Sequence, residues 1–144
     1  MLFGHLALIV AAIFTGAAIY VNVVEQPARL HLDDTALLSQ WKPAYKRGFV
    51  MQAPLAVVAF IFGLIAWWQT AEFGFLAGAV LMIANWPWTL VGIMPTNNAL
   101  MATEPTSATT QTRALIVKWG GLHAVRSGLG GIATIAFLWG CMSI

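Results

Sequence analysis

The stretch FVMQAPLAVVAFIFGLIAWWQ at residues 49–69 is followed, two residues later, by EFGFLAGAVLMIANWPWTLVGIM at residues 72–94. Each run has about the 20 apolar residues that a helix needs to cross the roughly 30 Å hydrocarbon core of a bilayer. The link between the runs holds no Lys or Arg and leaves room only for a tight turn. These runs therefore predict an antiparallel pair of transmembrane helices.

Further apolar runs, at about 2–24 and 114–142, are at least as long. The first is too long for the apolar part of a signal peptide, and no Lys or Arg precedes it, so we interpret it as a retained span. Open strands cannot satisfy their backbone groups in lipid. The expected fold is all-α: one domain over residues 1–144, an integral membrane four-helix bundle of antiparallel up-down spans with a long first cytoplasmic connection.

The composition agrees with a membrane protein. Of the 144 residues, 60% are hydrophobic and 8% are charged, whereas soluble domains carry about 25% charged residues. A small soluble domain has too much surface for its volume to hide so many apolar side chains. Seven basic against five acidic residues give no argument for nucleic acid as a partner. The single cysteine, Cys141, excludes an intrachain disulfide framework and a multi-cysteine metal site.

The basic residues are distributed unevenly between the two sides of the predicted bundle. All seven lie in or beside the two long connections: Arg29, Lys42, Lys46, Arg47, Arg113, Lys118 and Arg126. The N-terminus, the short link and the C-terminus have none. The positive-inside rule places both connections in the cytoplasm and both termini outside. The localisation that we expect is a bacterial inner membrane.

Tryptophans and small residues predict how the helices sit in lipid. The seven tryptophans lie mostly near the predicted span ends, where they would anchor the helices at the membrane interface. We keep a substrate contact open only for Trp119. Small residues recur every four positions at Gly120, Ala124 and Gly128, and again at Gly74 and Gly78. We expect both sets to form buried contacts, because small residues let helix backbones approach closely in lipid.

One face of the fourth span carries polar chemistry. Trp119, His123, Arg126 and Gly130 follow i, i+4, i+7, i+11 spacing and fall within about 60° of one another on a helix. Ionisable side chains inside a span are costly, so each of them is expected to have a partner or a function.

Other polar residues lie at the same depth, toward the cytoplasmic ends of their spans: Asn22, Glu25, Gln52, Asn97 and Asn98. An antiparallel bundle brings these ends together. We therefore expect one polar pocket, roofed by the two long connections and floored by apolar side chains. Within it, Glu25 and Arg126 would form an ion pair, which lowers the cost of holding either charge in the membrane.

Each residue also has a plain structural explanation. Arg126 would snorkel to the headgroups, His123 would bond a neighbouring carbonyl, and Asn97 with Asn98 would shape the turn after Pro95. The occurrence of the whole set at one depth favours a functional pocket.

Three separated motifs resemble the signatures of a family of small four-span membrane proteins. They are Gly16-Ala-Ala-Ile-Tyr-Val-Asn-Val-Val-Glu-Gln-Pro-Ala-Arg29, Met94-Pro-Thr-Asn-Asn-Ala-Leu100 and Trp119-Gly-Gly-Leu-His-Ala-Val-Arg126. The family is known mostly as a domain of unknown function, and it includes the anthrone oxygenases of polyketide pathways. The resemblance covers nearly the whole chain and implies the four-span fold.

The resemblance also implies a reaction. Anthrone oxygenases convert an anthrone to an anthraquinone with molecular oxygen, and the resemblance implies no established organic cofactor. The expected activity is that of a membrane-embedded oxidoreductase acting on a lipophilic phenolic or quinol-like substrate. We expect His123 to be the general base, because the ordinary pKa of histidine lies near neutral, and Arg126 and Asn97 to hold the oxyanion. The residues expected to bind the substrate are Asn22, Glu25, Gln52, Asn98 and Trp119.

Readings from other functional classes stay open. Small loops and abundant small residues also suit an accessory or assembly subunit of a larger membrane complex, and His123 could serve a metal- or haem-binding protein. The sequence has no Cys-x-x-Cys-His, no nucleotide-binding loop and no His-Glu-x-x-His. We assign no cofactor, with a bound metal or a quinone-like molecule as alternatives. The expected partners are the lipid bilayer and a lipophilic aromatic small molecule, with a homo-oligomer or a membrane complex left open.

The charge asymmetry generates a test of topology. A reporter fused after Ile144 should report a location outside the cytoplasm, and one inserted within Asp33–Ser39 should report the cytoplasm, because Lys and Arg hold loops inside. Alkaline phosphatase and green fluorescent protein, which are active on opposite sides, control for each other at both sites. A cytoplasmic C-terminus would contradict the predicted orientation.

Overall fold

The computed structural model describes all 144 residues and contains helices but no strand. In chain order they are α1 (Leu2–Tyr20), the π-helix η1 (Val21–Glu25), α2 (Gln26–Arg29), α3 (Asp34–Thr70), α4 (Phe73–Trp88), the π-helix η2 (Thr89–Ile93), α5 (Met94–Ala102), the 3-10 helix η3 (Pro105–Ser107) and α6 (Thr110–Met142). α1, η1 and α2 form one continuous helix, as do α4, η2 and α5. The chain thus has four helices long and apolar enough to cross a membrane, which confirms the expected all-α bundle.

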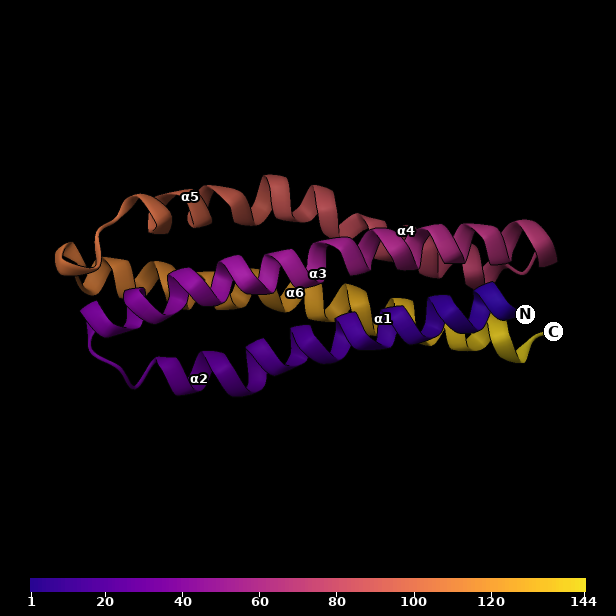
Figure 1. The fold of residues 1–144 in the computed structure, drawn as a ribbon, viewed down its shortest axis with the longest axis horizontal. Helices are drawn as coiled ribbons and strands as arrows, with labels where there is room; N and C mark the ends of the chain where they lie inside the picture. Colours follow the sequence, from indigo (N-terminus) through magenta and orange to yellow (C-terminus); the bar gives the residue numbers. More distant parts are fainter.

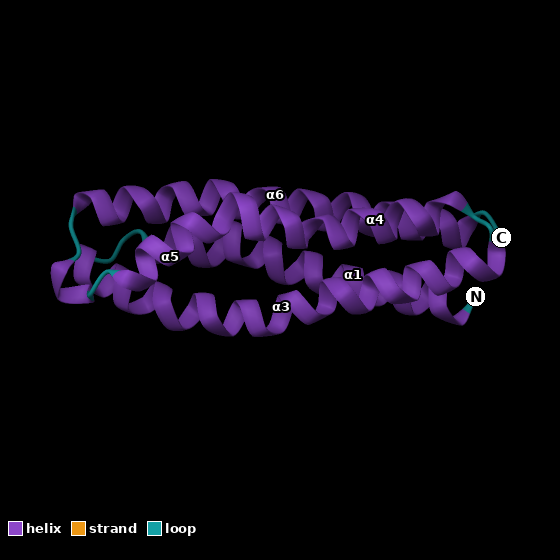
Figure 2. Cartoon of the chain, turned by 90° about the horizontal axis from the view of Figure 1, so that it is seen from above, coloured by secondary structure: helices purple, strands orange, loops and turns teal.

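The four long helices run up and down around a common axis. α1 packs against α3 and α6, and α4 packs against the same two helices. Both termini lie at one end of the bundle, and the α2–α3 and α5–α6 connections lie at the other (Figure 1 and Figure 2). Each helix therefore neighbours the helices before and after it in the chain, in the antiparallel order that the sequence predicts.

The helices are longer than the predicted spans. α3 has 37 residues, about 55 Å at 1.5 Å per residue, whereas the hydrocarbon core measures roughly 30 Å. The first connection is correspondingly shorter than expected, because the chain leaves helical structure only at residues 30–33. α3 begins so early because Asp33 caps it, accepting a hydrogen bond from the Ala36 N–H at 2.9 Å. Helix packing therefore continues beyond the length of a bilayer core.

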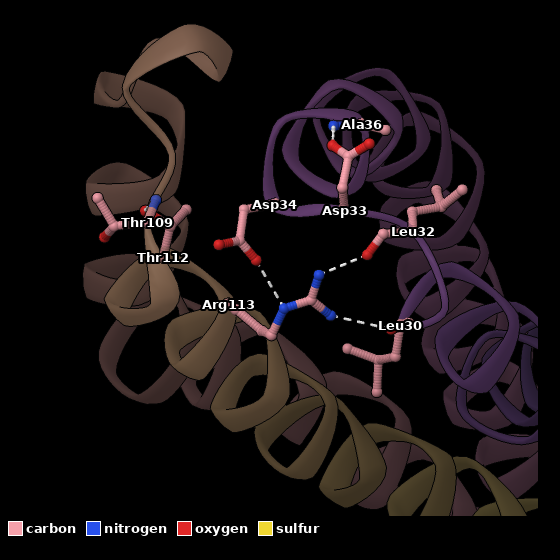
Figure 3. A network of polar contacts seen from close by, with 8 residues as sticks. All are labelled: Leu30, Leu32, Asp33, Asp34, Ala36, Thr109, Thr112 and Arg113. Atoms are coloured by element: carbon pink, nitrogen blue, oxygen red, sulfur yellow. Dashed lines mark hydrogen bonds and ion pairs between the residues drawn. The ribbon is translucent and has the colours of Figure 1, made fainter.

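Arg113, in the first turn of α6, ties together the end of the bundle that carries the connections. Its Nε donates to Asp34 Oδ1 at 2.7 Å, its Nη1 to the Leu30 carbonyl at 2.9 Å, and its Nη2 to the Leu32 carbonyl. Figure 3 shows the guanidinium group between these acceptors. A single cation thus satisfies carbonyls exposed after α2 ends and joins α2, α3 and α6.

The interior consists of two apolar clusters. The larger one fills the half of the bundle near the termini and is built mainly from alanines of all four long helices, with Phe14, Phe75, Met82 and Phe137 among them. Alanines allow the backbones to approach, and the larger side chains fill the remaining space. The smaller cluster, near the connections, consists of Leu37, Leu38, Trp41, Ile93, Leu100, Ile116 and Trp119.

Glycines set the contact between α4 and α6. A Cβ on Gly74 would lie 2.7 Å from the backbone nitrogen of Gly140, and a Cβ on Gly78 would lie 2.5 Å from the Phe137 ring. The close packing predicted for this glycine pair is confirmed.

The small-residue stripe predicted on the fourth span is wrong in two of its positions. Ala124 and Gly128 are exposed, and a Cβ on Gly128 would meet nothing within 4 Å. Only Gly120 is buried, against the side chain of Gln26. α6 instead packs through the face that carries its polar side chains, because those side chains find their hydrogen-bond partners on neighbouring helices.

Each π-helix directly precedes a proline. η1 is followed within two residues by Pro27, and η2 by Pro95. Proline offers no N–H to the carbonyl four residues earlier and its ring crowds that carbonyl, so a wider turn upstream relieves the conflict. The π-turns contribute Asn22, Glu25 and Thr89 to the polar part of the interior.

The α4–α6 contact generates a prediction about stability. Gly74→Ala should lower the free energy of unfolding by about 1–3 kcal/mol, because its Cβ would strike the Gly140 backbone. Gly128→Ala is the matched control: it removes a helical glycine in the same way, but the new methyl group meets open space. Thermal unfolding in mild detergent measures both. Equal melting temperatures for the two variants would mean that α4 and α6 do not pack as described.

Candidate functional site

A polar layer separates the two apolar clusters, and a pocket lies within it. The pocket is lined by Val21, Glu25, Arg29, Ala44, Tyr45, Gly48, Phe49, Gln52, Ile93, Asn97, Trp119, His123 and Arg126. Its unfilled space measures about 400 Å³ with the open mouth included, and little of it is enclosed and open enough to hold more than water. Sites for small molecules usually measure about 300–1,000 Å³. A small molecule of ordinary size would therefore fit only if the side chains around the mouth moved apart.

His123 is held in one orientation by Asn22. Its Nδ1 lies 2.9 Å from Asn22 Oδ1, and the Ser127 hydroxyl donates to the same oxygen at 2.8 Å. The Asn22 amide is fixed in this direction because its Nδ2 donates to the Gly120 carbonyl at 2.8 Å. An amide oxygen only accepts, so the proton of the neutral imidazole is on Nδ1. The other ring nitrogen, Nε2, is then an unprotonated base on a residue that lines the pocket.

Further hydrogen bonds join the first long helix to α6. Gln26 Nε2 donates to the Ile116 carbonyl at 2.8 Å, and the hydroxyls of Thr15 and Thr134 lie 3.1 Å apart. Together with Asn22, these residues place polar contacts at three levels of the same helix pair. Sliding one helix along the other would break all of them, so the position of His123 against the first helix is well determined.

Glu25 pairs with Arg29, and the expected Glu25–Arg126 ion pair is wrong. Glu25 Oε1 lies 2.7 Å from Arg29 Nη2 and accepts from Gln40 Nε2 at 3.1 Å. The pair has i, i+4 spacing within one helix, so it needs no group from α6. Arg29 is almost fully buried and its guanidinium lies 5.6 Å from the ring centroid of Trp119, a cation–π arrangement.

Arg126 has no carboxylate partner. It is 8% exposed, its Nε has no hydrogen-bond partner, and its guanidinium lies 5.5 Å from the ring centroid of Phe14. Around the same pocket, Gln52 Oε1 and both polar side-chain atoms of Asn97 are also buried without partners. Buried polar groups normally have partners, so this cluster offers donors and acceptors to a bound molecule.

Aromatic side chains of α3 and α6 form the roof of the pocket. Trp41 stacks on Tyr45 with a centroid distance of 5.0 Å and meets Trp119 edge-on at 5.7 Å. Trp119 in turn lies 5.0 Å from the His123 ring. The roof predicted from the two connections is therefore made of helix side chains, because α3 and α6 extend past the pocket.

The structure brings most of the predicted site residues together. The pocket lining includes Glu25, Gln52, Asn97, Trp119, His123 and Arg126. Asn22 does not line the pocket and lies behind His123. The structure does not bring Asn98 together with the others: it is exposed and does not line the pocket, because it is turned about 100° around α5 from Asn97. The catalytic and binding roles of these residues stay predictions.

Sequence reasoning did not select Arg29 or Tyr45, which also line the pocket. Arg29 lies four residues after Glu25, a spacing that places the two side chains together once the helix is known to continue past Pro27. Tyr45 lies seven residues before Gln52 and shares its face once α3 is known to begin at Asp34.

Tryptophans serve the bundle interior as well as the membrane interface. Trp68 and Trp139 are largely exposed, as interface anchors would be. Trp86 and Trp88 instead donate their indole N–H groups to the carbonyls of Ala53 and Leu122, at 3.2 and 3.0 Å.

No three His, Cys, Asp or Glu side chains cluster closely enough to hold a metal ion.

Comparison with known proteins gives consistent matches. The profile of a family described as anthrone oxygenase matches residues 41–136. An anthrone oxygenase of Claviceps purpurea (strain 20.1) is 28% identical over 138 residues, covering 85% of this chain and 79% of that protein. Anthrone oxygenase tpcL of Aspergillus fumigatus is 33% identical over 131 residues, covering 84% and 81%. Anthrone oxygenase nsrD of Aspergillus novofumigatus is 32% identical over 104 residues, covering 66% and 64%.

No solved structure matches the chain. The relatives named above are fungal, and the bacterial inner membrane expected from the charge pattern stays a prediction. The profile match covers most of the chain and includes the pocket residues of α3, α5 and α6. On these matches, the chain belongs to the anthrone oxygenase family.

Proposed function

We propose that this protein oxygenates a lipophilic anthrone-like phenol to a quinone with molecular oxygen, using His123 as the general base. The observation that carries the proposal is the hydrogen bond between His123 Nδ1 and Asn22 Oδ1. It leaves Nε2 unprotonated on a residue of the pocket wall, which is the state that a general base requires. The names of the related proteins support the choice of substrate class.

The reaction balances with dioxygen as the sole oxidant. His123 Nε2 takes one proton from the methylene carbon between the two aromatic rings, and the negative charge passes to the oxygen of the ketone. Dioxygen adds to the carbanion carbon, and the resulting peroxide takes the proton back from His123. Loss of the second methylene hydrogen and cleavage of the O–O bond then release water and leave a new carbonyl. The substrate loses four electrons, and one oxygen atom enters the product.

In this proposal Arg126 and Asn97 stabilise the charge that the deprotonation creates. Arg126 is a buried cation without a carboxylate, and the Asn97 amide has no partner. A desolvated oxyanion would satisfy both, and preorganised donors of this kind are worth most where water is excluded. Arg29 is less suited to the same task, because Glu25 already neutralises it.

The catalytic assignment predicts a graded set of variants. His123→Ala should lower turnover of an anthrone by about 10²–10⁴-fold, as expected for loss of a positioned general base. Asn22→Ala should also lower turnover, because it releases the imidazole and leaves its tautomer unspecified. Ser127→Ala is the matched control, since it removes the other hydrogen bond to Asn22 Oδ1 but leaves the imidazole contact intact.

Oxygen consumption and quinone absorbance, measured on protein of verified thermal stability, read out this series. The expected order is wild type equal to or slightly above Ser127→Ala, with Asn22→Ala well below and His123→Ala lowest. Full activity in His123→Ala would remove the general-base assignment. A large loss in Ser127→Ala alone would mean that the serine hydroxyl itself acts in the reaction.

Replacing each of the two buried arginines, Arg126 and Arg29, by methionine should change the stability of the protein in different ways. Arg126→Met should leave the melting temperature unchanged or raise it, because it removes a buried charge without stranding a carboxylate. Arg29→Met should lower stability by about 1.5–3 kcal/mol, the usual value of a hydrogen bond to a charged group, since it leaves Glu25 without its cation. Arg126→Met should also abolish stabilisation by a bound phenolic anthraquinone. Destabilisation by Arg126→Met with unchanged ligand response would show that the arginine has a structural role.

A further inference from the structure

A second cavity adjoins the pocket from the side of the bundle. It lies between α3 and the α4–η2 helix and is lined by Phe49, Ala53, Ala56, Trp86, Thr89 and Leu90, with Arg126 at its inner end. We call this cavity the α3–α4 cleft; its unfilled space measures about 310 Å³ with the mouth included. Phe49 and Arg126 line both the cleft and the pocket. The same arginine is therefore adjacent to both spaces, and the phenyl ring of Phe49 stands at their junction.

The cleft and the pocket mouth differ in polarity. The pocket carries Glu25 and Arg29 on the first helix, and widening it there would break the 3.1 Å hydrogen bond that Gln40 of α3 donates to Glu25. Arg126 is the only charged residue of the cleft, and most of the other side chains are apolar. An uncharged aromatic molecule offers no group to replace a broken hydrogen bond to a carboxylate, whereas it can replace lipid contacts with cleft contacts at little cost.

The outer lip of the cleft carries side chains suited to lipid. Leu90 is 56% exposed, and its neighbours on either side of the cleft, Val50 and Val91, are 71% and 80% exposed. All of them fall within the apolar runs at 49–69 and 72–94. Exposed apolar side chains concentrated in this way are stable in hydrocarbon rather than in water. The cleft therefore opens toward the interior of the bilayer.

Among the side chains that line the cleft, Phe49 separates the cleft from the pocket and could open a passage by rotating. Ala53 and Ala56 contribute only methyl groups on α3. Trp86 is fixed across the helix pair, because its Nε1 donates to the Ala53 carbonyl at 3.2 Å. Phe49 has no hydrogen-bonding group and is only half-buried, so rotation of its ring would join the two spaces without breaking a polar contact.

We infer that the α3–α4 cleft is the entry route from the bilayer for the lipophilic substrate, and that Phe49 is the gate between cleft and pocket. The inference rests on the function proposed above, because it takes the same pocket as the destination. Arg126 is the first charged group on this route, so the substrate meets the guanidinium with its oxygen-bearing end before it reaches His123. Phe49 is accordingly a positioning residue and has no part in the chemistry.

A matched pair of tryptophan variants tests the route, one at a residue that lines the cleft and one at a residue beside it. Leu90→Trp narrows the mouth of the cleft, whereas Val91→Trp adds the same ring to a neighbouring exposed position outside the cleft. With dihydroxyanthrone supplied in liposomes, we expect Leu90→Trp to lower kcat/KM about tenfold, mainly through KM, because entry precedes the chemical steps. Val91→Trp should match the wild type. Equal kinetics for the two variants with an active wild type would overturn the route and leave the proposed function standing.

A second pair of variants tests the role of Phe49 as the gate. Phe49→Ala should raise the rate of entry and lower KM, whereas Val50→Ala, which removes a lipid-facing side chain next to it, should change neither. A KM for Phe49→Ala equal to that of Val50→Ala would overturn the gate.

A measurement without turnover separates the route from the reaction. Anthraquinone abstracts hydrogen atoms when it is irradiated in the near ultraviolet, so it labels the side chains that it touches. In wild-type protein in liposomes we expect adducts at Leu90 that an excess of dihydroxyanthraquinone suppresses, because the cleft is a finite site, and adducts at Val91 that it does not suppress. This result in a protein that consumes no oxygen with anthrones would support the route and refute the proposed function. Adducts that are unsuppressed at both positions would overturn the route, whatever the activity.

Discussion

The side-chain amide of Asn22 links the first long helix to α6 through both of its polar atoms. Its oxygen accepts from His123 and Ser127, and its nitrogen donates to the Gly120 carbonyl. Helices in lipid are not drawn together by the hydrophobic effect, so close packing and hydrogen bonds must determine their relative positions. Asn22 supplies hydrogen bonds, and close packing occurs beside it at Gly120, where a side chain would strike Gln26, on the same helix as Asn22. The direction of the amide then fixes the tautomer of His123.

The arginines of the bundle differ in whether they form an ion pair with a carboxylate. Arg113 pairs with Asp34, and Arg29 pairs with Glu25. Arg126 has no carboxylate partner, although it is buried, as Arg29 is. Holding an unpaired guanidinium in such a position costs stability, and stability alone gives no reason to keep it. An anion formed during a reaction does give one, since it would be bound only while the charge exists.

The sequence was sufficient for the helices and for one face of the site. The lengths of the apolar runs determine how many helices can cross a bilayer. The spacing of Trp119, His123 and Arg126 alone predicts that these side chains share a face, and all of them line the pocket. Periodicity separates the faces of a helix but does not say which face points inward. For that reason the Gly120–Gly128 stripe was misplaced, as both faces of α6 are compatible with a helix contact. The partner of Glu25 was misjudged for a related reason, since depth matching cannot distinguish an intrahelical neighbour from one across the bundle.

The π-turns explain why regular helical periodicity does not predict which residues after η1 and η2 face the pocket. A π-turn contains one more residue than an α-turn, so every side chain after it is turned by about 100° relative to a regular helix. η1 lies between Thr15, which bonds α6, and Arg29, which lines the pocket. η2 lies between Asn85, which is buried and bonds carbonyls of its own helix, and Asn97, which lines the pocket. A regular helical wheel drawn through either segment therefore assigns the later residues to the wrong face. Pro27 and Pro95 follow these turns and do not line the pocket themselves, so they act on the site only through the path of the helix backbone. On this view the prolines of the Gly16–Arg29 and Met94–Leu100 motifs belong to the geometry of the pocket as much as its polar residues do.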